Sequence, residues 1–465
     1  MKKQILLINP AQNQTHVNKQ VGIYPSGALT LIGTMCQNEG HTVKIIDATV
    51  DTITVSEMKK IINYFNPDIA GITMNTFQTK NARLWLETIK EVDENILTVV
   101  GGPHPSALEL NIFKDFNNID ISVIGEGEFT FLEIVNGKNK EEIKGICYNN
   151  KINKLRPAAL NLDHVPPTNF DLVDLSKYPG IVGTGKSMFI MASRGCPSNC
   201  TYCNKSVFGT KVRYRSPKRV VEDIKQMHEK YGINEIYFQD DTLNLNRRWL
   251  ESIFNLIINN RLNIDVSYRI AFRANKNLVD EQLLALAKLA NVTSIFYGVE
   301  SGNQEMLNRM KKGLTIEELK RAFKLTHAAG IETTAAFIIG LPGETINTIK
   351  DTANMWKEIN AKQCGFTLAT PFPNTAFQKE IISKNHLLDT NYDNYRLGGN
   401  YIRTDELTSE QLEFFSVMLI LGHSHKQIHK LPYFTIGKSR MLCNIIVTMI
   451  RTLRCIKIIM NRKTW

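Results

Sequence analysis

Short apolar runs alternate with amphipathic segments along the first 135 residues, and this alternation limits the possible folds more than any other feature of the chain. The apolar runs predict strands at 4–8, 42–46, 69–73, 97–100 and 121–124. The amphipathic segments predict helices at about 26–39, 56–65, 78–92, 106–116 and 127–135. Such continuous apolar strands, separated by helices, indicate a doubly wound parallel sheet that is covered on both faces.

Small and turn-forming residues follow these predicted strands or precede the first predicted helix. Parallel strands end at one edge of the sheet, where doubly wound folds bind ligands, and glycine lets the backbone approach a ligand closely. We therefore expect a ligand site rather than a set of ordinary tight turns. Its candidate residues are Pro25, Ser26, Gly27, Thr73, Thr76, Gly101, Gly102, Pro103, Gly125 and Glu126. The Gly-x-Gly-x-x-Gly and Gly-x4-Gly-Lys-Ser/Thr patterns are missing, which disfavours dinucleotides and P-loop nucleotides.

A second strand–helix series follows a polar segment. Strands are predicted at 188–192, 234–239, 264–270, 293–298, 332–339 and 364–370, with helices at 217–230, 247–260, 280–290 and 315–329. Six such units are fewer than the eight of a closed barrel, so we expect a partial barrel. The predicted organisation is an N-terminal domain at 1–138, a hairpin and linker at 139–187, the partial barrel at 188–375, and a helical C-terminal region at 376–465.

Three cysteines follow the first strand of the second series at a Cys-x3-Cys-x2-Cys spacing, as Cys196, Cys200 and Cys203. Thiolates suit zinc, copper(I) and iron–sulfur clusters. A closed zinc site needs four protein ligands, and no fourth cysteine or histidine lies within ten residues on either side. Three thiolates on a four-iron cluster leave one iron free for a substrate or cofactor, which is the hypothesis that this spacing favours.

Composition places the chain among ordinary globular proteins. The short apolar start lacks a cleavage site, and no run of about 18 apolar residues occurs, so we expect a cytoplasmic protein with reduced cysteines. The net charge of +11 is dispersed, which makes nucleic acid a poor candidate partner. Basic residues gather only in an amphipathic helix predicted at 440–460, which is either a membrane-surface helix or a terminal helix packed on the barrel.

Taken together, these motifs resemble radical S-adenosylmethionine (radical SAM) enzymes. The three cysteines match the site of the 4Fe-4S cluster, and the aromatic Tyr202 precedes the third cysteine as in that family. Later strand ends resemble the segments that hold S-adenosylmethionine. The resemblance carries this role to Tyr202, Asp240, Arg273, Glu300, Ser301, Gly340, Gly343 and Pro371, while Asn374 stands where the family has a glycine.

The N-terminal segment resembles the Rossmann-like cobalamin-binding domain that precedes the barrel in one large subclass. The resemblance rests on Pro25-x-Gly27 and on the Gly-Gly-Pro-His sequence at 101–104. It implies that the ten candidate residues named above bind cobalamin. The Asp-x-His-x-x-Gly signature of a cobalt-ligating histidine is missing. His16 is the nearest match, and we expect no histidine ligand to cobalt.

The resemblance implies an enzyme with three cofactors: a 4Fe-4S cluster, S-adenosylmethionine and cobalamin. The expected reaction is methylation of an unactivated carbon in a small-molecule or lipid-like substrate, with a flavodoxin or ferredoxin as electron donor. One alternative is a non-methylating radical oxidoreductase, such as the anaerobic porphyrin-ring cyclases. Another is a non-catalytic cobalamin or cluster sensor. The full set of barrel motifs disfavours this alternative.

Overall fold

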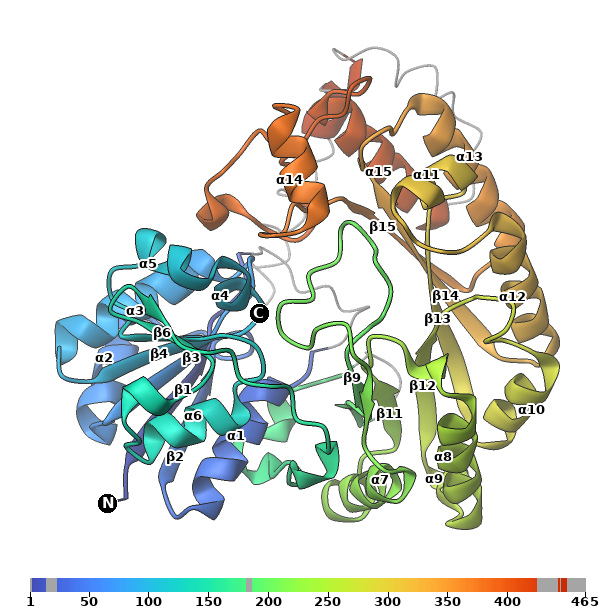
Figure 1. Cartoon of the computed structure of the whole chain (residues 1–465). Helices are drawn as coiled ribbons and strands as arrows, with labels where there is room; N and C mark the ends of the chain where they lie inside the picture. Colours follow the sequence, from blue (N-terminus) through green and yellow to red (C-terminus); the bar gives the residue numbers. More distant parts are fainter. Residues whose placement is uncertain (1, 14–22, 181–185, 425–441, 444, 450–465) are drawn as a thin grey trace, which may run out of the picture. The chain divides into compact units, whose positions relative to one another are not determined.

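The structure is a computed structural model that describes residues 2–13, 23–180, 186–424, 442–443 and 445–449 (Figure 1). The chain divides into two compact units, which are described separately. The first unit comprises Met1–Pro197, Asn204–Arg269 and Asn391–Leu397. The second comprises Ser198–Cys203, Ile270–Thr390 and Gly398–Trp465.

A seven-stranded sheet forms the centre of the N-terminal part, in the order β2-β1-β3-β4-β5-β6-β7. The strands are β1 (Gln4–Asn9), β2 (Thr42–Asp47), β3 (Ile69–Thr73), β4 (Leu97–Gly101), β5 (Ile121–Val123), β6 (Ile146–Tyr148) and β7 (Lys151–Ile152). Strands β1 to β5 pair in parallel, as predicted, and β6 and β7 pair antiparallel. The predicted hairpin therefore extends this sheet, and its turn residues Asn149 and Asn150 both adopt positive φ, at 47° and 58°.

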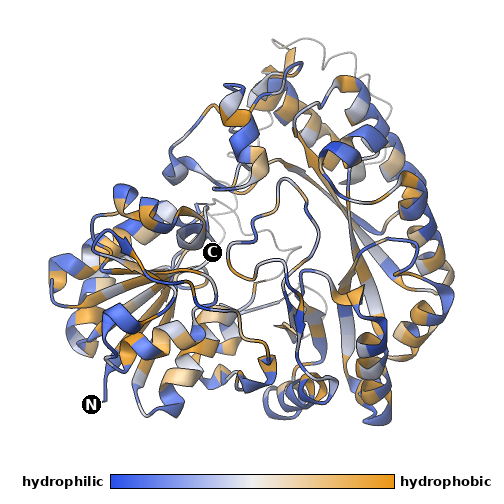
Figure 2. Cartoon of the chain, in the orientation of Figure 1, coloured by the Kyte–Doolittle hydropathy of each residue, from blue (hydrophilic) through white to orange (hydrophobic). Residues whose placement is uncertain are grey.

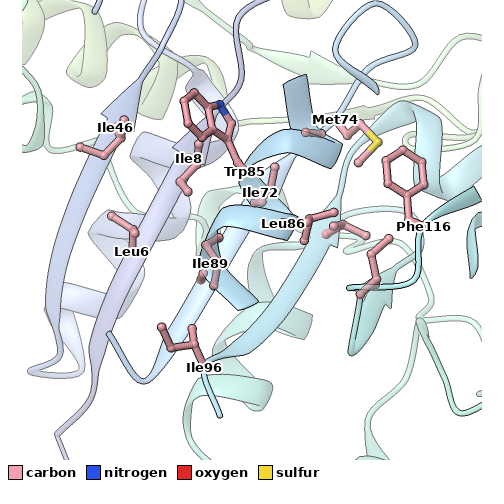
Figure 3. Close-up of a cluster of buried hydrophobic side chains, with 14 of the residues drawn as sticks. Leu6, Ile8, Ile46, Ile72, Met74, Trp85, Leu86, Ile89, Ile96 and Phe116 are labelled. Atoms are coloured by element: carbon pink, nitrogen blue, oxygen red, sulfur yellow. The ribbon is translucent and has the colours of Figure 1, made fainter. Parts of the chain in front are cut away.

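Alternate side chains of each parallel strand enter two different cores, because successive residues point to opposite faces. Leu6 and Ile8 pack with Trp85 and other residues of α3 (Thr79–Val92) in the cluster that Figure 3 shows. Leu7 packs on the other face with residues of α1 (Gly27–Asn38) and α6 (Glu128–Val135). Figure 2 shows the resulting apolar strands. Burial on both faces confirms the doubly wound arrangement.

The helices of this part begin and end close to the predicted positions, with one exception. Helix α2 (Val55–Phe65) starts with a capping box between Thr54 and Glu57. A helix predicted at 106–116 is instead broken into α4 (Pro103–Leu108), a 3₁₀ turn at Glu109–Asn111 and α5 (Ile112–Asp115). Glu109 adopts φ 52° and ψ −124°, a conformation that a continuous helix does not allow.

The second large sheet has six strands in chain order, β8-β11-β12-β13-β14-β15. They are β8 (Ser187–Ile190), β11 (Glu235–Phe238), β12 (Ser267–Phe272), β13 (Val292–Glu300), β14 (Glu332–Ile339) and β15 (Gln363–Leu368). A short antiparallel pair, β9 (Ser193–Arg194) and β10 (Arg213–Tyr214), lies outside this sheet. Strand β12 pairs with β11 in the first unit and continues into the second unit at Ile270. Six strands confirm the partial barrel.

Helices alternate with these strands. They are α7 (Pro217–Tyr231), α8 (Arg247–Asn259), α9 (Leu262–Asp265), α10 (Glu281–Leu289), α11 (Gln304–Arg309), α12 (Ile316–Ala328) and α13 (Ile346–Ile359). The strand predicted at 264–270 begins only at Ser267, since Leu262–Asp265 forms a helical turn after Arg261 in the left-handed region.

The C-terminal region contains α14 (Ala376–Ser383) and α15 (Ser409–Ser424). Most of the helix predicted at 440–460 lies outside the described residues. Within the described ones, Cys443 and Val447 are buried while Leu442 and Met449, of the predicted apolar face, are exposed. Among the helices that the structure describes, none is both long and apolar enough to cross a membrane.

Candidate functional site

A cavity of about 280 Å³ lies at the carboxyl ends of the N-terminal strands, within the first unit. Six of the ten residues predicted at this edge line it: Gly27, Thr73, Gly101, Gly102, Gly125 and Glu126. The lining does not include Pro25, Ser26, Thr76 or Pro103. Ser26 instead caps α1 by accepting from the amide of Leu29, and Thr76 shares a hydrogen bond of 3.1 Å with His104.

Two glycines of the cavity lining stand where a side chain would collide with neighbouring protein atoms. A Cβ on Gly102 would lie 2.8 Å from the Met74 carbonyl oxygen, and its φ of 109° disfavours any other residue. A Cβ on Gly71 would lie 2.8 Å from Leu7 and 2.9 Å from Phe131. Gly71 and Gly102 line the cavity with backbone atoms alone, and this glycine floor lies at the strand ends, where doubly wound folds bind ligands.

Sequence reasoning missed most of the cavity wall, which comes from segments distant along the chain. The aromatic lining residues are Phe131, Phe170, Phe189 and Phe208, and Met191 and Arg194 come from the chain that leads into the cysteine motif. Aromatic residues at such distances carry no periodic signal, so only the tertiary fold brings them together.

Arg194 forms a buried charge network at this wall. Its guanidinium pairs with Glu126 at 2.6 Å and Glu128 at 2.7 Å, and Arg213 pairs with Glu126 at 2.6 Å. Burial lowers the pKa of Arg194, but the two carboxylates outweigh this effect and raise its pKa above the usual value. The negative charge of Glu126 is therefore compensated by arginines, although the residue lines the cavity as predicted.

Two carboxylates at the end of β11 hold the chain that enters the cysteine motif. Asp240 accepts hydrogen bonds from the amides of Ala192 and Ser193 and, at 2.6 Å, from the Ser193 hydroxyl. Burial raises the pKa of Asp240 to about 7, against the lowering effect of these donors. Asp241 accepts from the amide of Gly195 at 3.2 Å. Asp240, a predicted S-adenosylmethionine residue, thus has protein partners that order the start of the motif.

The second half of the motif, Ser198–Cys203, belongs to the second unit and is fastened there by backbone hydrogen bonds. The Thr201 amide donates to the Met310 carbonyl at 3.0 Å, and the Thr201 carbonyl accepts from Phe377 at 2.9 Å. Arg273 adds a side-chain contact, since its Nη1 donates to the Ser198 hydroxyl at 2.6 Å. Its Nε donates to Asn275 and its Nη2 to the Lys312 carbonyl.

A buried ion pair lies at the end of β13. Lys312 Nζ is 2.6 Å from Glu300 Oε1 and 3.4 Å from the Tyr202 hydroxyl. Glu300 follows a register shift in β13 and adopts a φ of 67°, a conformation that non-glycine residues rarely take. Burial, then Glu300 and Cys200, raise the pKa of Tyr202 above its usual value. The structure thus brings the predicted residues Tyr202 and Glu300 together, and adds Lys312.

The remaining predicted S-adenosylmethionine residues lie at later strand ends of the second unit. Ser301 is fully buried and shares a hydrogen bond with Thr352 at 3.3 Å. Gly340 and Gly343 adopt φ of 97° and 88° in the loop after β14. Pro371 follows β15, and its carbonyl accepts from Gln378 at 3.5 Å. These residues lie in the loops after β13, β14 and β15, at the strand ends that the sequence predicted.

The cysteines of the motif are more exposed than most of the other described cysteines. Cys196 and Cys200 are partly exposed and Cys203 is exposed; Cys364 is also partly exposed, whereas Cys36, Cys147 and Cys443 are buried, and none of these cysteines forms a disulfide. Burial, by contrast, raises the pKa of Cys36 and Cys364 to about 12. Three accessible thiols are a donor set that suits an iron–sulfur cluster. Within the described residues no three His, Cys, Asp or Glu side chains surround a common metal position, so the fit rests on the chemistry of the thiols.

Comparison with known proteins finds a family for each of the two parts of the chain. Residues 190–355 match the radical SAM superfamily, and residues 16–135 match the B12 binding domain. An uncharacterized methyltransferase of Pyrococcus horikoshii is 34% identical over 419 residues, which cover 88% of this chain and 89% of the relative.

Two further similarities extend this comparison. The anaerobic magnesium-protoporphyrin IX monomethyl ester cyclase of Rubrivivax gelatinosus is 28% identical over 84% of this chain and 72% of its own length. The structure of the radical S-adenosylmethionine methyltransferase TsrM from Kitasatospora setae shares the fold, with a TM-score of 0.69 and 20% identity over 83% of this chain and 78% of that one.

These findings confirm the enzyme class that the motifs predicted, with methyl transfer favoured, and the cofactor class of an iron–sulfur cluster, S-adenosylmethionine and cobalamin. Two independent domain matches and one relative above 30% identity along almost the whole chain support the same conclusion. The chain belongs to the radical S-adenosylmethionine superfamily and carries an N-terminal B12-binding domain.

Proposed function

We propose that the protein methylates an unactivated carbon of a small-molecule or lipid-like substrate. The observation that carries this proposal is the glycine-floored cavity of the first unit, whose wall includes Met191 and Arg194, directly before Cys196. A cofactor pocket and the entry to the cysteine motif are thus built from one continuous stretch of chain. The similarity to a methyltransferase along most of the chain supports the same reaction.

Cobalamin is the proposed occupant of the cavity. Gly71 and Gly102 contribute only backbone atoms to the lining, and Phe131, Phe189 and Phe208 give an apolar wall for an extended ring system. His16 lies outside the described residues, and we propose that no histidine of this chain ligates cobalt. In the bound state cobalamin would supply a methyl group that the protein itself cannot carry.

Cys196, Cys200 and Cys203 are the proposed ligands of a 4Fe-4S cluster, which with S-adenosylmethionine supplies the radical chemistry. The chain's own part is to order these thiols. Asp240 and Asp241 accept hydrogen bonds from the residues that precede Cys196 in the chain. Arg273 donates to Ser198, which follows Cys196 in the chain. The proposed S-adenosylmethionine residues are those named from the resemblance, with Tyr202 and Glu300 in contact through Lys312.

Two features of the surroundings of the enzyme are proposed as well. An external one-electron donor, a flavodoxin or ferredoxin, would reduce the cluster. The free thiols of the described cysteines agree with a reducing, cytoplasmic location.

A second candidate function is oxidative ring closure without methyl transfer. The similarity to the Rubrivivax gelatinosus cyclase over 84% of this chain favours it. The two reactions differ in their products, because methyl transfer from a second S-adenosylmethionine leaves S-adenosylhomocysteine, whereas ring closure does not.

The test is anaerobic reconstitution with iron, sulfide and cobalamin, followed by reduction in the presence of S-adenosylmethionine. We expect release of 5′-deoxyadenosine, and its loss in Cys200→Ala. A matched control is Cys364→Ala, because Cys364 is a cysteine of β15 outside the motif. Undiminished release in Cys200→Ala would refute the cluster assignment, and turnover of the substrate without S-adenosylhomocysteine would rule out methyl transfer and leave a non-methylating radical reaction such as ring closure.

A further inference from the structure

Lys312 is a buried lysine that the sequence motifs do not mark. Its side chain lies at the end of β13, and only 9% of the residue is exposed. Burial of an ammonium is costly unless the charge is paired and hydrogen-bonded. The chain pairs it with Glu300, itself only 7% exposed, at 2.6 Å.

The backbone around this ion pair is arranged to accommodate it. Gly298 precedes the register shift in β13, and a Cβ at this position would collide with Glu300 Oε1 and lie 2.9 Å from Lys312 Nζ. Glu300 itself adopts the left-handed region, and so does Lys311 at φ 52°. Unfavourable backbone conformations that are retained around a buried charge pair are typical of functional sites.

The ammonium of Lys312 has donor capacity beyond its ion pair, and the guanidinium of Arg273 is fixed to protein groups by all three of its nitrogens. Each of the three guanidinium nitrogens of Arg273 donates to a protein acceptor: Nε to Asn275, Nη1 to Ser198 and Nη2 to the Lys312 carbonyl. The ammonium of Lys312 has three N–H donors, and within the described residues two acceptors are found for it, Glu300 and the Tyr202 hydroxyl. One donor therefore remains for a ligand.

We propose that Lys312 binds the carboxylate of S-adenosylmethionine. The contact with the Tyr202 hydroxyl places its ammonium beside the residue that separates Thr201 from Cys203, on the cysteine motif itself. A carboxylate is the anionic group of the cofactor's methionine part, and a buried ammonium is its complement in a site of low dielectric. Arg273 is then a positioning residue, because it donates hydrogen bonds to the Ser198 hydroxyl and the Lys312 carbonyl.

The role of Lys312 rests on the proposed function, since it presumes that S-adenosylmethionine binds at this end of the second unit. The test therefore measures binding rather than turnover. Dissociation constants of S-adenosylmethionine and of decarboxylated S-adenosylmethionine are determined by equilibrium dialysis with the reconstituted full chain. The variants are Lys312→Met and Lys312→Arg, with Lys311→Met as matched control because the neighbouring Lys311 is exposed.

If Lys312 binds the carboxylate, its replacement should weaken binding of S-adenosylmethionine more than binding of the decarboxylated analogue. Lys312→Met should lower the preference for S-adenosylmethionine over its decarboxylated analogue by about tenfold, as expected for the loss of one charge-assisted hydrogen bond of about 1.5 kcal/mol. Lys312→Arg should keep most of the preference, and Lys311→Met all of it. If Lys312→Met weakens both ligands equally, or neither, Lys312 does not bind the carboxylate.

Two controls separate the possible failures. Iron content is measured for every variant, because removal of Lys312 leaves Glu300 without its buried partner. If Lys312→Met loses its cluster, the double variant Lys312→Met/Glu300→Gln, which removes both charges, must show the same loss of preference, or the proposal is wrong. If the unmodified protein holds no cluster or binds no S-adenosylmethionine, it is the proposed function that fails.

Discussion

Gly298 has no side chain, and the ion pair between Glu300 and Lys312 depends on this. The carboxylate of Glu300 and the ammonium of Lys312 occupy the space that a Cβ would need. Gly298→Ala must therefore displace the ion pair, at a cost of about 1–3 kcal/mol in the free energy of unfolding. Gly365→Ala on β15 is the control, because its Cβ would meet no atom within 4 Å.

Thermal unfolding and S-adenosylmethionine binding measure this effect. We expect Gly298→Ala to lower the melting temperature and to weaken binding, and Gly365→Ala to change neither. Equal melting temperatures for the two variants would show that the pocket around Glu300 can relax without loss.

Glu344 is a fully buried carboxyl group whose titration should be visible in stability. Its oxygens accept from the Gly340 amide and the Thr348 hydroxyl, yet burial raises its pKa from 4.5 to about 7. The folded state thus binds a proton more tightly than the unfolded state. This contribution to stability is fully present below pH 4.5 and is lost as the pH rises through 7, by about 3 kcal/mol in total.

Replacement of Glu344 by glutamine removes this titration. Between pH 5 and 8, Glu344→Gln should lose less stability than the unmodified chain, whereas Glu317→Gln, at a side chain that is 85% exposed, should follow the unmodified chain. Unfolding in urea at several pH values measures the difference, and parallel pH profiles for all three proteins would contradict the prediction.

At the scale of elements, the strand–helix alternation was enough to predict the sheets because their strands are buried on both faces or alternate regularly. It failed where a local backbone state overrides periodicity, as at Glu109 and Arg261. The alternation also carries no information about Lys312, since two adjacent lysines are usually solvated, and only the packing of β13 shows that one of them is buried. The alternation likewise does not predict that Arg194 pairs with Glu126 and Glu128, because these residues are far apart in the sequence.

The short segment Asn391–Leu397 is an element that no sequence pattern assigned to the N-terminal part. It contains a 3₁₀ turn, Tyr392–Asn394, and belongs to the first unit. Thr79 donates to the Tyr392 carbonyl at 2.9 Å, and Arg83 pairs with Asp393 at 3.0 Å. The Arg83 guanidinium also lies 4.4 Å from the centre of the Phe116 ring.

Removal of Arg83 should release this segment from α3. Loss of a half-exposed ion pair and a cation–π contact costs about 1 kcal/mol, so hydrogen exchange of the 391–397 amides should be about fivefold faster in Arg83→Ala. Lys80→Ala, an exposed lysine on the same helix, should leave exchange unchanged. Identical exchange in both variants would mean that the segment is held by its backbone contacts alone.

At the scale of the whole molecule, the two proposed cofactors have separate sets of residues. Every residue that lines the cavity belongs to the first unit, as does Cys196, whereas Cys200 and Cys203 belong to the second, and none of the three cysteines lines the cavity. The binding of cobalamin should therefore be independent of the cluster. We expect Cys200→Ala/Cys203→Ala to lose its iron and to keep cobalamin at the stoichiometry of the unmodified chain, measured by absorbance after gel filtration.

The converse variant is Gly101→Leu. Gly101 lines the cavity, and a Cβ there has room, at 3.7 Å from Val123 Cβ, so the added carbons extend into the cavity without forcing the backbone. This variant should lose cobalamin and keep its iron, because none of the motif cysteines lines the cavity. Loss of cobalamin together with the cluster in the double cysteine variant, at an unchanged melting temperature, would instead show that the two cofactors bind cooperatively.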